Sequence, residues 1–218
     1  MKFPFTVEEF LNVFKSYNES IFPFQIIFYL IAFFSIYLVF KQYENNSKII
    51  SAFLSFFWLW IGIVYHILFF TSINKAAYIF GGLFIIQGIL FVIYGIIKNS
   101  ITFEYQNNIY NYIAIIFISY ALIIYPILGY SFGHKYPYSP TFGLPCPTTI
   151  FTFGILLFIN KKIPVLVLII PLLWSIIGFG AALNLSIYED YGLLVAGILG
   201  FILLVVSNKN YSKMIKTI

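Results

Sequence analysis

The sequence predicts an all-α polytopic membrane protein, a single domain of about seven transmembrane helices preceded by a short interfacial helix. Of its 218 residues, 61% are hydrophobic and only 9% are charged, and the mean hydropathy is +0.97. A soluble domain is far less apolar. The apolar residues form runs of about 20, the length that a helix needs to cross the ~30 Å hydrocarbon core. The charged residues fall between these runs, as expected for loops at a membrane surface.

Residues 1–20 are expected to form an amphipathic helix that lies in the membrane interface. Thr6 and Glu9 have the spacing of a capping box, which opens a helix by satisfying its first free N–H groups. The apolar side chains that follow share one helical face: Phe10, Val13, Phe14 and Tyr17. A helix of this kind binds with its apolar face against the membrane or the protein.

Residues 22–206 divide into seven candidate spans, at 22–40, 49–70, 76–97, 109–130, 147–160, 163–183 and 187–206. The fifth is short, because Lys161 and Lys162 follow it directly. Its length is about 21 Å at ~1.5 Å per residue. Its start at Cys146 and Pro147 is therefore expected to lie below the membrane surface. The loop before it, residues 131–147, should dip inward, which irregular backbone tolerates only where protein or water lines the space.

The lysines predict the orientation. An N-terminus outside the cell places eight lysines on the cytoplasmic side and four on the outer side. The inner group is Lys41, Lys48, Lys98, Lys161, Lys162, Lys209, Lys213 and Lys216, and the outer group is Lys2, Lys15, Lys75 and Lys135. The tail, residues 207–218, is then cytoplasmic. The chain has no Arg, so no guanidinium is available for phosphate, and we expect the lipid bilayer as a partner and no nucleic acid.

Two histidines fall toward the outer side in this topology. His66 lies about one turn inside the outer end of the second span, next to Tyr65. An ionisable group at that depth favours a protein or water-lined interior, where it binds a ligand or transfers protons. The alternative is an interfacial His bonded to a carbonyl. His134 lies in a loop rich in Gly and Pro, where the alternatives are a functional and a merely solvated side chain.

The only cysteine, Cys146, precedes Pro147 at the expected start of the fifth helix, and Thr148 and Thr149 follow in its first turn. A helix N-terminus presents unpaired N–H groups and partial positive charge, so it can hold an anion or activate a thiol. The alternative is that Cys146 and the threonines only cap a buried helix entrance.

Two acids, Glu189 and Asp190, precede the last span. Ser186 and Glu189 have capping-box spacing, which gives Glu189 a structural explanation. Asp190 is the better candidate for a pocket carboxylate, although a helix N-terminus also favours a second acid. Gly192, Ala196 and Gly200 repeat every four residues along the same helix, a pattern typical of close packing between membrane helices.

A metal site is one reading of these residues. His66, His134 and Cys146 are the residue types that Zn or Cu accepts, but no two of them have local ligand spacing. The sequence therefore requires no cofactor, and a metal ion remains an alternative.

Long segments of the chain resemble a bacterial multi-pass membrane family catalogued as domain of unknown function 6064. These segments are FPFTVEEFLNVFKSYNESIFPFQ, VYHILFFTSINKAA, YPILGYSFGHKYPYSPTFGLPCPTTIFTFG and IPLLWSIIGFGAALNLSIYEDYGLL. The resemblance implies a protein of the bacterial inner membrane. It implies no activity.

The leading hypothesis is an outward-facing polar pocket that binds or transports a small solute or ion. Its candidate residues are Tyr65, His66, His134, Cys146, Thr148, Thr149, Glu189 and Asp190. One alternative is a membrane-embedded, metal-assisted enzyme that uses His66, His134, Cys146 and Asp190, which requires these side chains to converge on one point. Another is a structural or partner-binding membrane subunit whose polar residues only cap helices.

Overall fold

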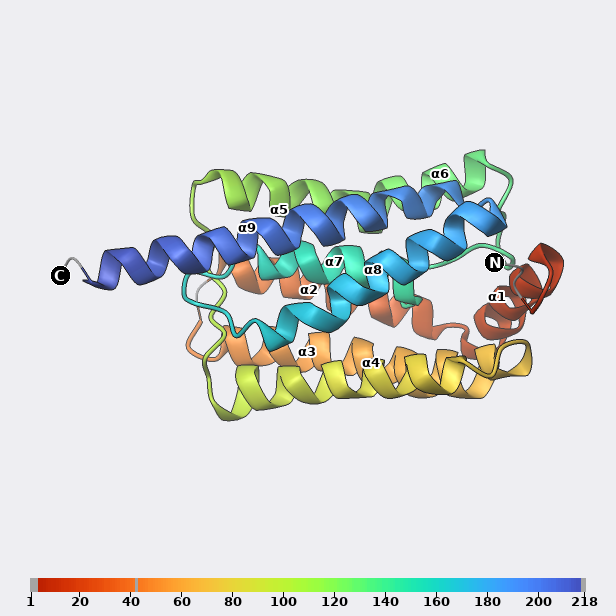
Figure 1. The fold of residues 1–218 in the computed structure, drawn as a ribbon, viewed down its shortest axis with the longest axis horizontal. Helices are drawn as coiled ribbons and strands as arrows, with labels where there is room; N and C mark the ends of the chain where they lie inside the picture. The colour runs from red at the N-terminus through yellow and green to blue at the C-terminus, as the bar shows by residue number, and fades with distance from the viewer. Residues whose placement is uncertain (1–3, 42, 217–218) are drawn as a thin grey trace.

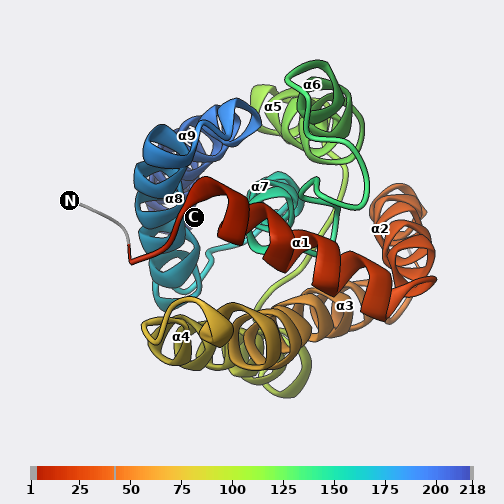
Figure 2. The ribbon, with the colours of Figure 1, turned by 90° about the vertical axis from the view of Figure 1, so that its right-hand side faces the viewer.

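The computed structural model describes residues 4–41 and 43–216, with side chains through residue 212, and Lys2 lies outside this part. The fold is all-α. Helices α2 (Phe24–Phe40), α3 (Asn46–Trp60), α4 (Ala77–Phe91), α5 (Ile109–Ser119), α8 (Leu166–Leu185) and α9 (Tyr191–Lys216) form a ring. Helix α7 (Pro145–Leu156) lies inside the ring, and α1 (Val7–Ile21) crosses one end of it (Figure 2).

Several helices continue past their regular α-helical part. Helix α3 runs on through the π-helical η1 (Ile61–Phe69) and the 3-10 turn η2 (Phe70–Ser72). Helix α4 runs on through the π-helical η3 (Val92–Ile97), and α5 through η4 (Tyr120–Ile124) into α6 (Tyr125–Ser131). A π-helical insertion shifts the side chains that follow it around the helix axis, and such insertions are frequent at functional sites.

Within the described residues, five helices are long and apolar enough to cross a membrane: 46–72, 77–97, 109–131, 166–185 and 188–212. A sixth span results if α1 and α2, bent by 84° at their junction, are counted together. The prediction of about seven spans is therefore corrected to five or six. Side chains such as Leu30, Leu68 and Ile79, exposed on the bundle surface, are apolar, as lipid contact requires.

Helix α2, with 17 residues, counts as a span only together with α1, and α7 does not count at all, since it has only 12 residues and is surrounded by other helices (Figure 2). Every residue of α7 except Cys146 is buried. Close packing against α9 uses the predicted small residues: a Cβ added at Gly200 would lie 2.7 Å from the Phe153 ring of α7, and Ala196 is fully buried. The predicted helix-packing stripe is thus confirmed.

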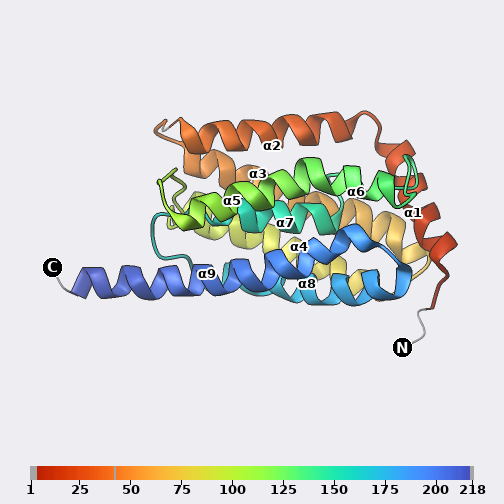
Figure 3. The same cartoon turned by 90° about the horizontal axis from the view of Figure 1, so that it is seen from above.

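Helix α1 begins as predicted, with the Thr6–Glu9 capping box, and Val13, Phe14 and Tyr17 are buried on its inner face. It lies across the end of the bundle (Figure 3). The buried Asn18 fastens it to the loop between α6 and α7. The Asn18 amide donates to the carbonyls of Pro137 and Ser139, at 2.7 and 2.9 Å, and the Thr141 hydroxyl donates to its oxygen.

The second half of that loop runs into the bundle. The Phe142 ring lies 5.3 Å from the rings of both Phe57 and Phe151. Gly143 follows with φ +99°, and an added Cβ would lie 2.3 Å from the Phe28 ring. Only glycine fits both this backbone conformation and this close contact. The loop therefore delivers α7 to the interior of the bundle.

The helices of the ring alternate in direction, so the connections gather at two ends (Figure 1). The α1 end holds α1, residues 73–76, the loop at 132–144 and residues 186–187. The opposite end holds residues 98–108 and 157–165 and the C-terminal part of α9, which continues past the predicted boundary at residue 206. The membrane side of each end remains a prediction from the lysines.

Candidate functional site

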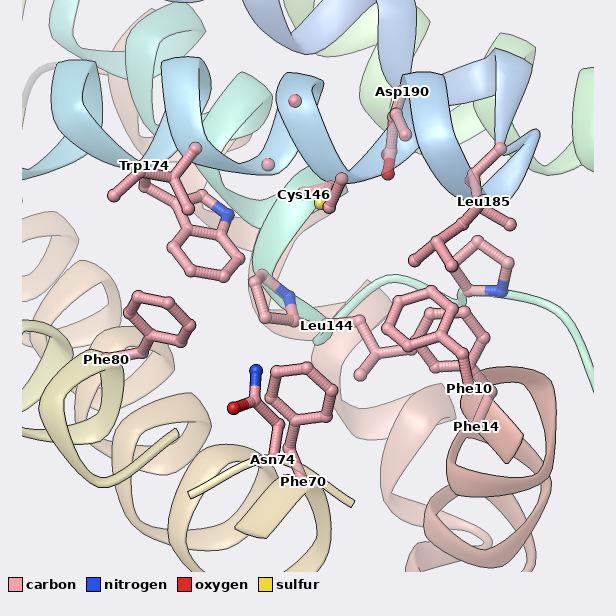
Figure 4. A pocket seen from close by; sticks show the side chains of 18 of the residues that line it. Phe10, Phe14, Phe70, Asn74, Phe80, Leu144, Cys146, Trp174, Leu185 and Asp190 are labelled. Carbon is pink, nitrogen blue, oxygen red and sulfur yellow. The ribbon is translucent and has the colours of Figure 1, made fainter. Parts of the chain in front are cut away.

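A cavity of about 380 Å³ lies at the α1 end, where α7 begins (Figure 4). It is bounded by α1, the end of η1 with η2, the start of α4 and the second half of α8. Most of its wall is apolar, and it includes the aromatic side chains of Phe5, Phe10, Phe14, Tyr65, Phe70, Phe80 and Trp174. Its few polar groups include Asn74, Cys146, Asn184 and Asp190.

Asp190 is the acidic group of the cavity. It is only 6% exposed, and its carboxyl extends toward the cavity (Figure 4). The Tyr125 hydroxyl donates a hydrogen bond to Oδ1, and the Cys146 thiol lies beside it. Ser186, with φ +59°, ends α8 and reverses the chain, and the 3-10 turn η5 (Tyr188–Asp190) then leads into α9. This sharp connection brings the side chain of Asp190 inward.

The start of α7 differs from the prediction. The helix begins at Pro145 rather than Pro147, so two of its first three residues are prolines. Proline has no N–H, so Cys146 supplies the only main-chain donor of these three positions. The Thr149 hydroxyl donates to the Pro145 carbonyl at 2.8 Å, whereas the buried Thr148 hydroxyl has no partner among the described residues. Few donors are left here for an anion.

His134 and Glu189 form a pair beside the cavity. His134 Nδ1 lies 2.8 Å from Glu189 Oε1, the Glu189 side chain is fully buried, and that of His134 is 12% exposed. The hydrogen bond with Glu189 raises the pKa of His134 above its ordinary value, against the opposing effect of burial. Gly129 makes room, since an added Cβ would lie 3.0 Å from Oε1.

This pair corrects the predicted capping box of Ser186 and Glu189. Ile187 occupies the N-cap position of η5, and no side chain caps the turn. The Glu189 side chain contacts His134 of the distant loop instead. Glu189 and Asp190 are neighbours in sequence, yet Glu189 pairs with His134 and Asp190 faces the cavity.

A family model matches residues 7–214, from the first residue of α1 almost to the end of α9. The chain belongs to DUF6064, a family of unknown function. No curated protein and no solved structure matches the chain significantly. The match covers the whole bundle of this DUF6064 protein, including the cavity and the His134–Glu189 pair.

His66 is not a wall residue of the cavity. It is fully buried in η1, with its ring 5.1 Å from Trp174 and 4.7 Å from Phe84 between centroids. Neither ring nitrogen has a hydrogen-bond partner among the described residues. The alternative of an interfacial His bonded to a carbonyl is therefore wrong, and the neighbouring Tyr65 reaches the cavity instead.

The side chains proposed as metal ligands do not converge on one point. Within residues 4–41 and 43–212, no group of three or more His, Cys, Asp or Glu side chains could hold a metal ion. His134 is engaged by Glu189, His66 is enclosed by aromatic rings, and Cys146 lies beside Asp190. The structure thus brings together Tyr65, Cys146 and Asp190, and separately His134 and Glu189.

Sequence reasoning missed several wall residues of the cavity. It also missed Tyr125, which is no wall residue but donates a hydrogen bond to Asp190, because its position in the unusual stretch around His134 and Cys146 does not reveal its partner. Trp174 looks like any aromatic residue of a span. Its indole N–H has no partner among the described residues and points toward Cys146 (Figure 4). Amphipathicity placed Phe10 and Phe14 on the apolar face of the first helix, but it did not predict that they line a cavity.

Proposed function

We propose that this DUF6064 protein binds a small, largely apolar molecule at the outer side of the bacterial inner membrane. The observation that carries the proposal is the aromatic cavity of about 380 Å³ that contains Asp190. Sites for small organic molecules are concave, mainly apolar and supplied with a few polar groups, and their volumes are about 300–1,000 Å³.

The lining favours an organic molecule over a bare ion. An ion that loses its water needs several polar groups at once in exchange. The cavity has aromatic and aliphatic walls with scattered polar side chains, and no metal-binding group exists within the described side chains. The burial of apolar surface would supply most of the binding free energy, at ~25 cal/mol per Å².

The rim of the cavity supports entry from the membrane. Ile176 and Ile177 of α8 belong to the lining and are also exposed on the outside of the bundle, at 51% and 41%. Exposed isoleucines on a candidate span face lipid, so the cavity adjoins the hydrocarbon region there. A molecule dissolved in the outer leaflet would then reach the cavity without crossing water.

The packing beyond the cavity supports binding rather than free passage. The buried helix α7 occupies the axis of the bundle from the floor of the cavity onward. Its inward-lying residues Phe151, Phe153 and Ile155 are fully buried. A permanently open path along the axis would require this helix to be absent or displaced.

The experiment fills the cavity and measures binding of a neutral probe, phenylbutanol, to purified protein in lipid nanodiscs by calorimetry. Gly180 lines the cavity, and a Cβ added there meets no atom within 4 Å, so Gly180→Leu would occupy the space without a backbone clash. Gly82 of α4 has the same open surroundings but does not line the cavity, so Gly82→Leu is the matched control.

We expect saturable binding to the wild type and to Gly82→Leu, and at least about tenfold weaker binding to Gly180→Leu, because the leucine displaces the probe. Empty nanodiscs measure partitioning into lipid. Binding no greater than to empty nanodiscs, or equal binding to both variants, contradicts the proposal.

A further inference from the structure

We propose that the molecule carries a cationic amine that pairs with Asp190. The inference rests on the proposed function, since it concerns the occupant of the same cavity. It follows from the spare acceptor sites of the Asp190 carboxyl, from the lack of a cation hydrogen-bonded to it, and from the aromatic rings that line the same cavity.

The Asp190 carboxyl has an unused acceptor. Its Oδ1 accepts the hydrogen bond from Tyr125, and the Cys146 thiol donates a second one to the carboxyl, which leaves about half of the roughly four acceptor sites of a carboxylate unused. The carboxyl extends toward the cavity (Figure 4). A ligand atom in the cavity therefore has direct access to a strong acceptor.

The described part of the protein supplies no cation to this carboxyl. No Lys lines the cavity, and His134, the nearby basic side chain, is hydrogen-bonded to Glu189. Burying a carboxylate without a counter-charge is costly in free energy, and this cost falls when a cation binds beside it. A bound ammonium group would supply both the charge and the N–H donors.

The wall of the cavity suits an amine attached to an apolar body. Phe10 and Phe70 lie in edge contact at 5.9 Å between centroids, and Tyr65 stacks on Phe70 at 5.7 Å. The faces of such rings carry negative electrostatic potential and attract cations, most strongly where water is displaced. The same rings provide the apolar contact area for the rest of the molecule.

The negative charge of Asp190 also discriminates against other ligands. A carboxylate or phosphate in the cavity would be repelled by Asp190, and the proline-rich start of α7 offers it few N–H groups. A neutral alcohol could donate one hydrogen bond to Oδ2 but would leave the charge uncompensated. A charge-assisted hydrogen bond is about twice as strong as a neutral one.

The test compares three probes of similar shape, phenylbutylamine, phenylbutanol and phenylbutyrate, by calorimetry on the full chain in nanodiscs of neutral lipid. We expect the amine to bind about tenfold or more tightly than the alcohol, and the butyrate to bind weakest. Asp190→Asn keeps the shape and removes the charge, so it should abolish the preference for the amine. Glu44→Gln, which changes an exposed acid at the opposite end, should preserve it.

Each outcome separates this inference from the proposed function. If the alcohol binds as tightly as the amine, or if Asp190→Asn retains the preference, the amine assignment is wrong while the cavity still binds an apolar molecule. If no probe binds the wild type above empty nanodiscs, both fail. Thermal unfolding checks that Asp190→Asn is folded. If it is not, Asp190→Ser, which also removes the charge, replaces it, and the preference for the amine should again be lost.

Discussion

The two ends of α7 differ in what their polar groups do. At its C-terminal end, the Asn111 amide donates to the Leu157 carbonyl at 3.0 Å. Buried Asn208 pairs with both main-chain groups of Ile163, at 2.8 and 2.9 Å. At the N-terminal end, Asp190 faces a cavity lined mostly by apolar side chains, several of them aromatic.

The opposite end also contains a cavity, of about 400 Å³, but amide and hydroxyl side chains dominate its wall, among them Gln106, Asn108, Asn160, Ser207 and Asn210. Asn160 is itself hydrogen-bonded to Thr102 and Glu104. Buried polar groups that are mutually satisfied hold a fold together, whereas a carboxyl with spare acceptor sites in an apolar cavity is available to a ligand. This difference supports the proposal of a structural end and a binding end.

The largest expected effect concerns the loop that delivers α7. Gly143 and Gly133 have nearly the same backbone conformation, with φ +99° and +96°, but only Gly143 is in tight contact, with Phe28. Gly143→Ala should lower the free energy of unfolding by about 2–5 kcal/mol, from left-handed strain and overpacking, and Gly133→Ala by about 1–2 kcal/mol from strain alone. Chemical denaturation measures both, and equal losses would contradict the described packing.

The next effect tests the structural end. Asn208→Leu removes both hydrogen bonds to Ile163 and leaves a buried N–H and C=O unpaired, so the free energy of unfolding should fall by about 2–3 kcal/mol. Affinity for phenylbutylamine, measured well below the unfolding temperature, should stay within about twofold of the wild type. A large loss of affinity would mean that the two ends are not independent.

A smaller effect follows from the His134–Glu189 pair. The pKa of His134 is higher in the folded protein than in the unfolded chain, where it is about 6.5. The pair therefore contributes its full stabilisation below pH 6.5, and this contribution is lost as the pH rises through the folded-state pKa. Stability should therefore fall by about 1 kcal/mol between roughly pH 6 and pH 9.

The control for this pH dependence is His134→Asn, which cannot titrate. Glu189 and Asp190 are the charged groups that interact with His134. Stability is measured by thermal unfolding. We expect the stability of the wild type to fall over this pH range and that of the variant to stay constant. If the stability of the wild type instead increases with pH over that range, the pairing of His134 with Glu189 is refuted.

The smallest effect concerns α1, which covers the cavity with Phe10 and Phe14. Thr6→Ala removes the capping hydrogen bond to the Glu9 N–H and should cost about 0.5–1 kcal/mol of helix stability. Proteolysis within α1 should accelerate, and amine release should quicken without a change in the selectivity between probes. Val7→Ala, an exposed change in the same turn, is the control.

Much of the fold followed from apolar run lengths. The predicted run at 76–97 differs little from the observed helix at 77–97, because spacing and length determine which residues can cross a membrane. The shortness of α7 also followed from Lys161 and Lys162. Its central position did not, because a helix that is apolar all round carries no sign of whether lipid or protein surrounds it.

The site was predictable only in part. Cys146 and Asp190 are two of the predicted pocket residues, and both line the cavity. The role of Glu189 was misjudged because a capping box is a local pattern, whereas its partner His134 lies 55 residues earlier in the chain. The aromatic wall was invisible, since Phe and Trp are common in every span and no spacing distinguishes those that face a cavity.

The most direct test of the binding end is photolabelling with a diazirine derivative of phenylbutylamine, followed by peptide mapping of the full chain in nanodiscs. The account predicts adducts on cavity residues such as Phe14, Tyr65 and Trp174, which an excess of phenylbutylamine suppresses. Adducts confined to lipid-exposed residues such as Leu30 and Ile79, unaffected by that competitor, would contradict it.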